Sequence, residues 1–164
     1  MQEKILVIGK KGLLARSVIN YLKIIGKVFV VISPSSSENK VDITKKEKLV
    51  ESLDAIKPNV IINCSGTVNL DFCEKNPVQA WNLNTIAVFN IINWVKRKNC
   101  KYIGISTDQV YDLNGSKENN RNVIYNQYAA SKYCAEKIAL THNNSLVIRT
   151  NIVGIRGSTD HTFF

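Results

Sequence analysis

The amino-acid sequence predicts an α/β fold in which helices cover a doubly wound parallel β-sheet. Short aliphatic runs alternate with segments of helical periodicity along the 164 residues, and a glycine-containing turn joins the first aliphatic run to the first helical segment. Alternating strands and helices form right-handed βαβ units, which build a parallel sheet with helices packed on it. Ligands bind beyond the carboxyl ends of the strands in such sheets, so functional residues are expected at that edge.

The first two strands are expected at Ile5–Ile8 and Val28–Ile32. Both runs consist of aliphatic and largely β-branched residues, which is typical of strands covered on both faces. Between them, apolar residues recur at near-helical spacing from Leu14 to Ile25 and predict a helix.

The middle of the chain repeats this alternation. Thr44 and Glu47 have the spacing of an N-terminal capping box, so a helix is expected to begin there. Val60–Ile62 is the expected third strand. The pair Asn76-Pro77 supplies an N-cap and a first-turn proline, which predicts a long helix ending near residue 98.

The last third of the chain completes the expected sheet. Tyr102–Ser106 is the fourth strand, Tyr128–Thr141 is a helix and Ser145–Arg149 is the fifth strand. All 164 residues are expected to form one domain, since the length is ordinary for one.

Composition excludes several classes of protein. Hydrophobic residues make up 45% and charged residues 21%, which is ordinary for a globular domain. No apolar run approaches the roughly 20 residues of a membrane span, so no membrane association and a cytoplasmic location are expected. The four cysteines form no C-x-x-C pair, which predicts reduced, mostly buried thiols and no metal site.

The chain is basic, with 22 lysines and arginines against 13 acidic residues and a net charge of +9. A nucleic-acid-binding surface would interleave aromatic residues with these cations or would carry a recognisable module. Neither is found, and a positive field also attracts phosphorylated small molecules. No nucleic-acid partner is therefore expected.

The turn after the first strand has the composition of a phosphate-binding loop. It reads Gly9-Lys10-Lys11-Gly12-Leu13-Leu14-Ala15. Small residues allow a tight turn close to a pyrophosphate, and the following helix offers free N–H groups and the positive end of its dipole. Glycine turns are common, but one placed between a strand and a helix favours a dinucleotide-binding Rossmann domain over a plain turn.

The segment after the second strand bears on the choice of dinucleotide. Domains selective for NAD place an acidic residue there to hold the ribose hydroxyls, whereas this chain has Ser33. Ser33 and Ser35, with the two lysines of the glycine turn, would accept a 2′-phosphate, which favours NADPH over NADH. Asp42, followed by Ile43, either accepts a hydrogen bond from the adenine amino group or simply precedes a helix.

Tyr128 and Lys132 are the candidate catalytic pair. They lie four residues apart in an expected helix, so both side chains project from one face. Ser106 and Thr107 end the fourth strand and reach the same edge of the sheet. A Y-x-x-x-K spacing occurs often by chance, but its combination with the glycine turn and this strand end favours a shared site.

With these motifs the chain resembles the extended short-chain dehydrogenases/reductases, and within them the dTDP-4-dehydrorhamnose reductase family and related sugar-nucleotide reductases. The matching stretches span almost the whole chain: Gly9–Ala15, Asp42–Thr44, Asn63–Thr67, Asp71–Glu74, Asn84, Ser106–Asp112, Tyr128–Lys132 and Arg149-Thr150. The stretch S-T-D-Q-V-Y-D at residues 106–112 is the most specific, because it separates this branch from many epimerases and dehydratases.

The resemblance implies that Thr107, Tyr128 and Lys132 form a catalytic triad. Tyr128 would protonate the keto oxygen as hydride arrives, and Thr107 would hold that oxygen. Lys132 and the oxidised nicotinamide would lower the tyrosine pKa from its ordinary value of about 10. The cofactor contacts implied besides Tyr128 and Lys132 are Gly9, Lys10, Lys11, Gly12, Leu13, Leu14, Ser33, Asp42, Ile43, Cys64, Ser65, Gly66 and Asn84.

The implied activity is reduction of the keto group of a nucleotide-linked 4-keto-6-deoxy sugar by NADPH or NADH. A non-catalytic nucleotide-binding relative and a sugar-nucleotide epimerase or dehydratase remain as alternatives, and a homodimer is a candidate assembly. Members of the family are longer and carry most substrate-binding segments in their second half. The substrate-binding part is therefore expected to be missing here, and turnover by this chain to be low.

Overall fold

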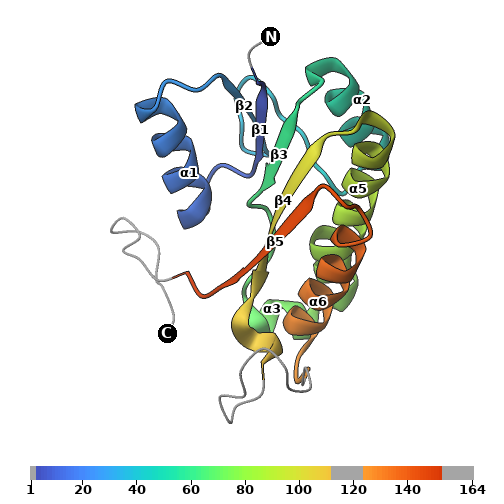
Figure 1. Cartoon of the computed structure of the whole chain (residues 1–164). Helices are drawn as coiled ribbons and strands as arrows, with labels where there is room; N and C mark the ends of the chain where they lie inside the picture. Colours follow the sequence, from blue (N-terminus) through green and yellow to red (C-terminus); the bar gives the residue numbers. More distant parts are fainter. Residues whose placement is uncertain (1–2, 112–123, 153–164) are drawn as a thin grey trace.

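A five-stranded parallel sheet, in the order β2-β1-β3-β4-β5, forms the centre of the computed structural model, which describes residues 3–111 and 124–152 (Figure 1). The strands are β1 (Ile5–Ile8), β2 (Phe29–Ile32), β3 (Val60–Asn63), β4 (Lys101–Thr107) and β5 (Ser145–Thr150). Each lies within one residue of its expected bounds. The prediction of a parallel α/β sheet is confirmed.

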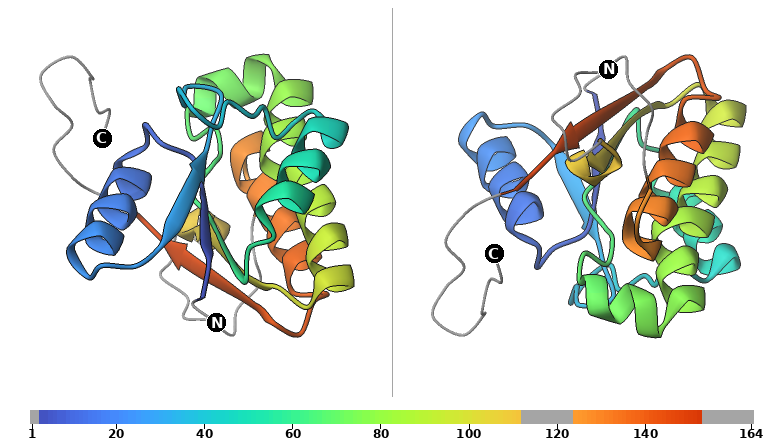
Figure 2. Two further views of the ribbon diagram at one scale, coloured as in Figure 1. Left: turned by 90° about the horizontal axis from the view of Figure 1, so that it is seen from above. Right: turned by 90° about the horizontal axis from the view of Figure 1, so that it is seen from below.

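Helices cover the two faces of the sheet unequally (Figures 1 and 2). The helices are α1 (Leu13–Ile24), α2 (Lys46–Ile56), α3 (Leu70–Lys75), α4 (Pro77–Trp81), the π-helical turn η1 (Asn82–Ile86), α5 (Ala87–Lys98), the 3₁₀ turn η2 (Asp108–Val110) and α6 (Gln127–Ala139). One face carries α1, and the other carries α2, α5 and α6. Among the described residues, no helix is long and apolar enough to cross a membrane.

The sheet reverses its winding at β1. This strand pairs with β2 on one side and with β3 on the other, so Ile8 lies beside both Ile32 and Asn63. The chain therefore places β2 on one side of β1 and then crosses over to place β3, β4 and β5 on the other side. Doubly wound sheets bind their ligands in a crevice at this position, beyond the carboxyl ends of β1 and β3.

Apolar side chains form separate cores on the two faces. The larger core joins β1, β3 and β4 to α2, α5 and α6, with Trp94 at 1% exposure among its members. The smaller core lies under α1 and contains Ile5, Val7, Leu22 and Val60. Burial of this kind contributes about 25 cal/mol for each Å² of apolar surface removed from water.

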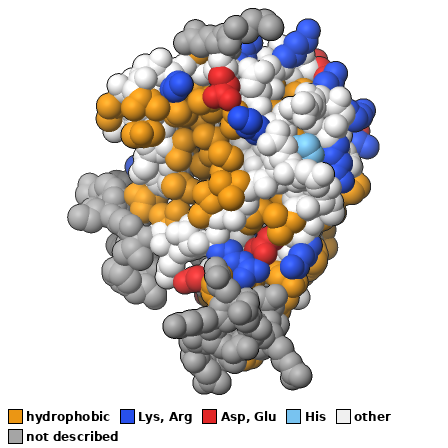
Figure 3. All heavy atoms as spheres, viewed as in Figure 1, with side chains coloured by type: hydrophobic (Ala, Val, Ile, Leu, Met, Phe, Trp, Pro, Cys, Tyr) orange, Lys and Arg blue, Asp and Glu red, His pale blue; other side chains and the backbone are white. Residues whose placement is uncertain are grey.

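The face that carries α1 is open beyond β3. Leu146 and Ile148 of β5 are 55% and 41% exposed there. They lie beside Ile103 and Ile105 of β4, which are half-buried. Figure 3 shows hydrophobic side chains gathered on this side of the molecule. We call Ile103, Ile105, Leu146 and Ile148 the open sheet face.

Two expected features of the helices are wrong. The capping box does not form, because the Thr44 hydroxyl donates to Asp42 Oδ1 (2.7 Å) and α2 begins only at Lys46. The long helix expected to end near residue 98 does form, as the contiguous elements α4, η1 and α5, but the cap expected at its start is absent. Its Asn76 side chain does not cap it but donates to the Phe72 carbonyl at 3.1 Å. Helix α3 was not expected. Only Cys73 of its six residues is buried, so the segment carries little of the apolar periodicity that predicts a helix.

Candidate active site

Gly9 brings the turn after β1 against the end of β3. Its φ is +106°, and a Cβ atom there would lie 3.3 Å from both the carbonyl carbon and the carbonyl oxygen of Cys64. The structure therefore requires glycine at this position. Gly12 differs, because its φ is −61° and a Cβ atom there would meet nothing within 4 Å. The space in front of Gly12 is open.

The N-terminus of α1 is free to meet an anion. Its first turn holds no acidic residue, and its N-cap residue Gly12 offers no side-chain cap. The N–H groups of the first turn, which begins with Leu13 and Leu14, have no partner within the helix. Lys10 and Lys11 lie exposed in the preceding turn. This end of the helix has the properties of a phosphate-binding turn.

Asn63, the last residue of β3, organises the loop that follows it. Its Oδ1 accepts hydrogen bonds from the Ser65 N–H (3.1 Å) and the Ser65 hydroxyl (2.5 Å). Its Nδ2 donates to the Tyr102 hydroxyl at 3.1 Å. These contacts hold the loop at Cys64–Gly66 beside Gly9.

Lys132 of α6 reaches the same loop. A Cβ atom at Gly66 would lie 3.8 Å from Lys132 Nζ and 3.1 Å from Asn84 Oδ1. Removal from water lowers the pKa of Lys132 to about 8, and the Cys64 thiol opposes that change. Burial raises the pKa of the Cys64 thiol to about 11. Because only a thiolate is strongly nucleophilic, Cys64 is not a nucleophile near neutral pH.

Asn84 connects the β3 loop to α6 through the π-helical turn η1. Its Oδ1 accepts from the Thr67 N–H (2.9 Å), and its Nδ2 donates to the Thr67 carbonyl (3.1 Å) and to Ser131 Oγ (3.0 Å). Next to it, the Thr85 hydroxyl donates to the Ser131 carbonyl at 2.8 Å. Asn84 is 1% exposed and uses both of its amide hydrogens. It therefore supports the loop, and no amide hydrogen remains for a ligand.

Tyr128 and Thr107 lie buried at the carboxyl edge, with 8% and 3% exposure. Burial raises the pKa of Tyr128, and interaction with the Thr107 hydroxyl opposes the rise. This direction is the reverse of the expected one. The reason is that desolvation of the phenolate exceeds the stabilisation that the Thr107 hydroxyl gives it.

Three side chains fix the N-terminus of α6, where Tyr128 lies. Asn126 Oδ1 caps the helix by accepting from the Ala129 N–H at 2.7 Å. Glu74 of α3 accepts from the Gln127 N–H (2.6 Å), and the Trp81 indole donates to Gln127 Oε1 (2.9 Å). Sequence reasoning assigned none of the three this role, although Glu74 lies in one of the stretches that match the family. Asn126 has the recognisable chemistry of an N-cap, whereas Glu74 and Trp81 give no local signal.

A bidentate ion pair joins α6 to β5. Arg149 donates to both carboxylate oxygens of Glu136, at 2.9 and 2.6 Å, and its guanidinium lies 5.0 Å from the centre of the Tyr111 ring. Burial would raise the pKa of Glu136, but the hydrogen bonds and the charge of Arg149, with smaller contributions from other side chains, together hold the pKa below its ordinary value. Glu136 was another residue that sequence reasoning missed.

The segment after β2 holds the other expected contacts. The Ser33 hydroxyl is buried and lies 2.9 Å from Ser35 Oγ. Asp42 is exposed, and its Oδ1 accepts hydrogen bonds from Thr44. Ile43 belongs to the larger apolar core, so its side chain is not available to a cofactor. These residues lie away from the Tyr128 and Lys132 side chains, at the outer side of the sheet.

Comparison with known proteins identifies the family. The model of the RmlD substrate binding domain family matches residues 3–163. The chain belongs to this family.

Two curated relatives of this RmlD-family chain are named as reductases. It is 32% identical to a probable low-salt glycan biosynthesis reductase of Haloferax volcanii, over 93% of this chain and 55% of that protein. It is 30% identical to a dTDP-4-dehydrorhamnose reductase of Aggregatibacter actinomycetemcomitans, over 90% of this chain and 51% of that protein. The chain thus spans about half the length of the curated relatives it matches.

Solved structures show the same fold. The dTDP-4-dehydrorhamnose reductase of Bacillus anthracis, in complex with NADP, superposes with a TM-score of 0.80 at 25% identity, over 91% of this chain and 53% of that one. The Yersinia enterocolitica dTDP-4-dehydrorhamnose reductase superposes with a TM-score of 0.83 at 25% identity, over 98% and 57% of the two chains.

Proposed function

We propose that this chain binds NADPH or NADH along the carboxyl edge of the sheet and belongs to a reductase of nucleotide-linked 4-keto-6-deoxy sugars. One observation carries the proposal. Lys132 Nζ lies against Gly66, in a loop whose Cys64 carbonyl contacts Gly9. The candidate catalytic helix and the candidate phosphate turn therefore meet at one edge of the sheet. The names of the relatives support the substrate class.

The residues at this edge fit a dinucleotide. The open space at Gly12 and the uncapped N-terminus of α1 suit a pyrophosphate. The crevice beside β3 leads from there to Lys132, where a nicotinamide ribose would find an ammonium donor. When bound, NADPH or NADH supplies the hydride.

Three side chains would serve the keto group. The raised pKa of Tyr128 keeps its hydroxyl protonated near neutral pH, which suits a group that donates a proton to the developing alkoxide oxygen. Thr107 would hold the same oxygen by a hydrogen bond. Lys132 would orient the ribose, and its charge would stabilise the phenolate left after proton transfer.

Calorimetric titration with NADPH and with NADH tests the cofactor assignment. We expect a one-to-one complex with at least one of them, since the expected cofactor contacts all lie within the described residues. A folded sample that binds neither dinucleotide would exclude the proposal.

A turnover assay with dTDP- and UDP-linked 4-keto sugars separates the proposed reductase from its alternatives. A reductase oxidises NADPH in step with substrate, whereas an epimerase or dehydratase leaves the reduced cofactor level unchanged. If the protein is non-catalytic, it binds cofactor but shows no turnover, even when it is tested in a form as long as the curated relatives. We expect this chain alone to be far slower than a full-length relative, because substrate positioning is worth about 7–11 kcal/mol of barrier.

A further inference from the structure

The connection between α1 and β2 exposes a group of large apolar side chains. Four of them are between 43% and 73% exposed: Tyr21, Ile24, Ile25 and Val28. None belongs to the core under α1, in which this helix buries Leu22. Figure 3 shows hydrophobic side chains over this end of α1, at the upper left. We call the four residues the apolar tip.

A hydrogen-bonded turn holds the apolar tip in place. Gly26 has a φ of +64°, and its N–H donates to the Lys23 carbonyl at 3.1 Å. The Lys27 N–H donates to the Leu22 carbonyl at 3.0 Å. These two hydrogen bonds form a Schellman motif, which commonly ends a helix. The exposure of the tip is therefore a property of an ordered turn.

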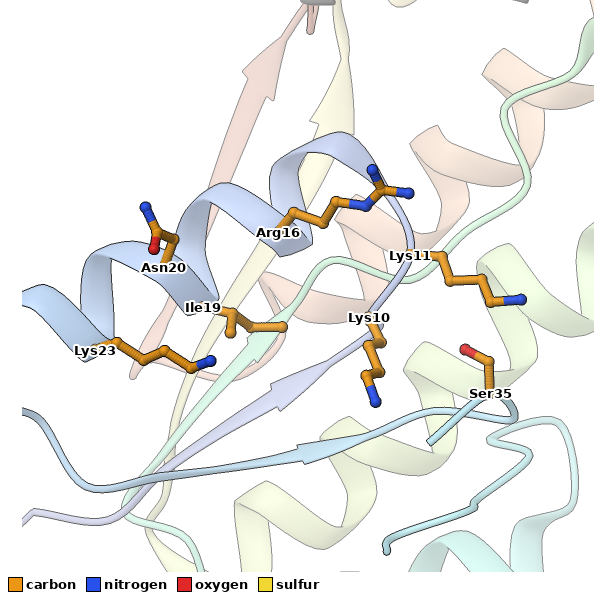
Figure 4. Close-up of a pocket in the computed structure, with 7 residues that line it drawn as sticks. All are labelled: Lys10, Lys11, Arg16, Ile19, Asn20, Lys23 and Ser35. Atoms are coloured by element: carbon orange, nitrogen blue, oxygen red, sulfur yellow. The ribbon is translucent and has the colours of Figure 1, made fainter. Parts of the chain in front are cut away.

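Positive charge flanks the apolar tip. Lys23 and Lys27 lie exposed within the same connection, and among the described residues they form no ion pair. No acidic residue occurs in the sequence from Leu13 to Phe29. Lys23 also lines a hollow between α1 and the segment after β2, where it lies at the far end from the glycine turn (Figure 4).

Further cations continue along the amino edge of the sheet, where the strands begin. Lys4 lies beside the tip, because the next residue, Ile5, donates its N–H to the Val28 carbonyl at 3.3 Å. The Lys4 ammonium group donates to the Ile56 carbonyl at 3.0 Å, next to the exposed Lys57. Apolar side chains and cations therefore share this edge of the molecule.

We propose that this edge binds the surface of a lipid bilayer that contains anionic headgroups, with the apolar tip inserted among them. Exposed aliphatic side chains next to lysines are typical of protein segments that lie in a membrane interface. Each lysine near an anionic bilayer adds to the attraction. A single-stranded nucleic acid would instead be held by aromatic rings that stack on bases, whereas three of the four tip residues are aliphatic.

Such binding needs no membrane-spanning segment. The sequence predicted no membrane association because the chain has no apolar run of spanning length. A tip that enters only the headgroup region does not require one. The tip lies at the edge of the sheet opposite Tyr128 and Lys132, so binding there does not depend on the proposed function.

Cosedimentation with lipid vesicles tests the proposal. The native chain should bind mixed vesicles, made of phosphatidylcholine and phosphatidylglycerol in equal amounts, at least about tenfold more tightly than vesicles of phosphatidylcholine alone. Lys23→Gln/Lys27→Gln should lose about tenfold or more of the affinity for mixed vesicles, because two attractive charges are removed. Ile24→Ser/Ile25→Ser should also lose about tenfold, because the inserted apolar surface is removed.

Two matched controls leave the tip intact. Lys45→Gln/Lys46→Gln removes the same charge at the start of α2. Leu146→Ser/Ile148→Ser removes two large apolar side chains from the open sheet face. Both controls should bind mixed vesicles as the native chain does. Circular dichroism verifies the folding of each variant.

The other outcomes would overturn the proposal in distinct ways. Equal losses in the tip variants and the controls would show binding that is not specific to this edge. Unchanged binding by Ile24→Ser/Ile25→Ser would show attraction by charge without insertion. If mixed vesicles do not bind, a single-stranded oligonucleotide that binds through Lys23 and Lys27 would assign the edge to nucleic acid. In the same case, a concentration-dependent mass that Ile24→Ser/Ile25→Ser abolishes would assign the tip to a contact between two copies of the chain.

Discussion

At the scale of single residues, Tyr128 carries the sharpest chemical expectation. Its hydroxyl is the proposed proton donor, and its side chain is buried in the first turn of α6, which Asn126 caps. Replacing it with phenylalanine keeps the ring and removes the proton. In a form of the protein that reduces a nucleotide-linked keto sugar, Tyr128→Phe should lose more than about nine-tenths of kcat.

The same variant should leave the NADPH dissociation constant within about twofold of the native value, since the hydroxyl is not expected to hold the cofactor. Steady-state assays give kcat, and calorimetry gives the dissociation constant. Retention of more than about a tenth of the native rate would rule out proton donation by Tyr128.

Lys132 should make the free energy of unfolding depend on pH in the alkaline range. Its pKa is about 8 in the folded chain against 10.5 for an ordinary lysine. Between these values the unfolded state holds more protons, so the free energy of unfolding rises as the pH rises. From pH 7 to pH 9.5 the gain should reach up to about 2 kcal/mol.

Urea unfolding at the two pH values measures this gain, and Lys132→Met serves as the control because it has no proton to lose. The native chain should gain more stability than Lys132→Met between pH 7 and pH 9.5. Equal changes in both would show that the ammonium group of Lys132 is not desolvated.

At the scale of elements, the turn between β1 and α1 contains two glycines required for different reasons. Gly9→Ala should destabilise the fold by about 1–3 kcal/mol, because it combines a positive φ with a close approach to Cys64. Gly12→Ala should cost less, about 0.5–1 kcal/mol, because its Cβ atom enters open space and the fold loses only the preference of an N-cap for glycine over alanine.

Gly12→Ala should nevertheless weaken the binding of NADPH, since the added methyl group occupies the space proposed for the pyrophosphate. Thermal unfolding and NADPH titration of the two variants measure both effects. A Gly12→Ala protein with native affinity would contradict the placement of the pyrophosphate at this turn.

Local patterns in the sequence predicted the elements well, and tertiary contacts account for what they missed. The strands were foreseeable because aliphatic runs such as Ile5–Ile8 are buried on both faces. The capping box at Thr44 was predicted wrongly because its hydroxyl can pair either with the backbone at Glu47 or with Asp42. In the structure it donates to the Asp42 carboxylate. The turn η1 was not foreseeable, because its contacts with Ser131 lie 46 and 47 residues away.

The residues of the candidate site likewise fall into those that local sequence patterns reveal and those that only tertiary contacts reveal. The glycine turn and the Tyr128–Lys132 spacing are local patterns, so the sequence was enough to find them. Glu136 and its partner Arg149 belong to different elements, and only the folded chain brings them together.

At the scale of the whole molecule, the open sheet face should cause self-association. Leu146 and Ile148 place two large apolar side chains in water beside Ile103 and Ile105. Covering such a side chain contributes about 1.5–3 kcal/mol. The native chain should therefore show a concentration-dependent mass in sedimentation equilibrium, and Leu146→Lys/Ile148→Lys should remain a monomer.

Val78→Lys is the matched control, because Val78 is 72% exposed on α4, outside the open sheet face. It should associate as the native chain does. A native chain that stays monomeric at all concentrations, or a control that dissociates as fully as the double variant, would show that the open sheet face does not drive association.

The contact between Gly9 and the carbonyl group of Cys64 has a consequence for divergence within the family. It is made by main-chain atoms, and the pairing of Asn84 with Thr67 uses only the backbone of Thr67. Substitutions at residues 64 and 67 should therefore leave the shape of this edge unaltered. We expect remote homologues to vary freely at these two positions while retaining glycine at position 9 and an amide at position 84.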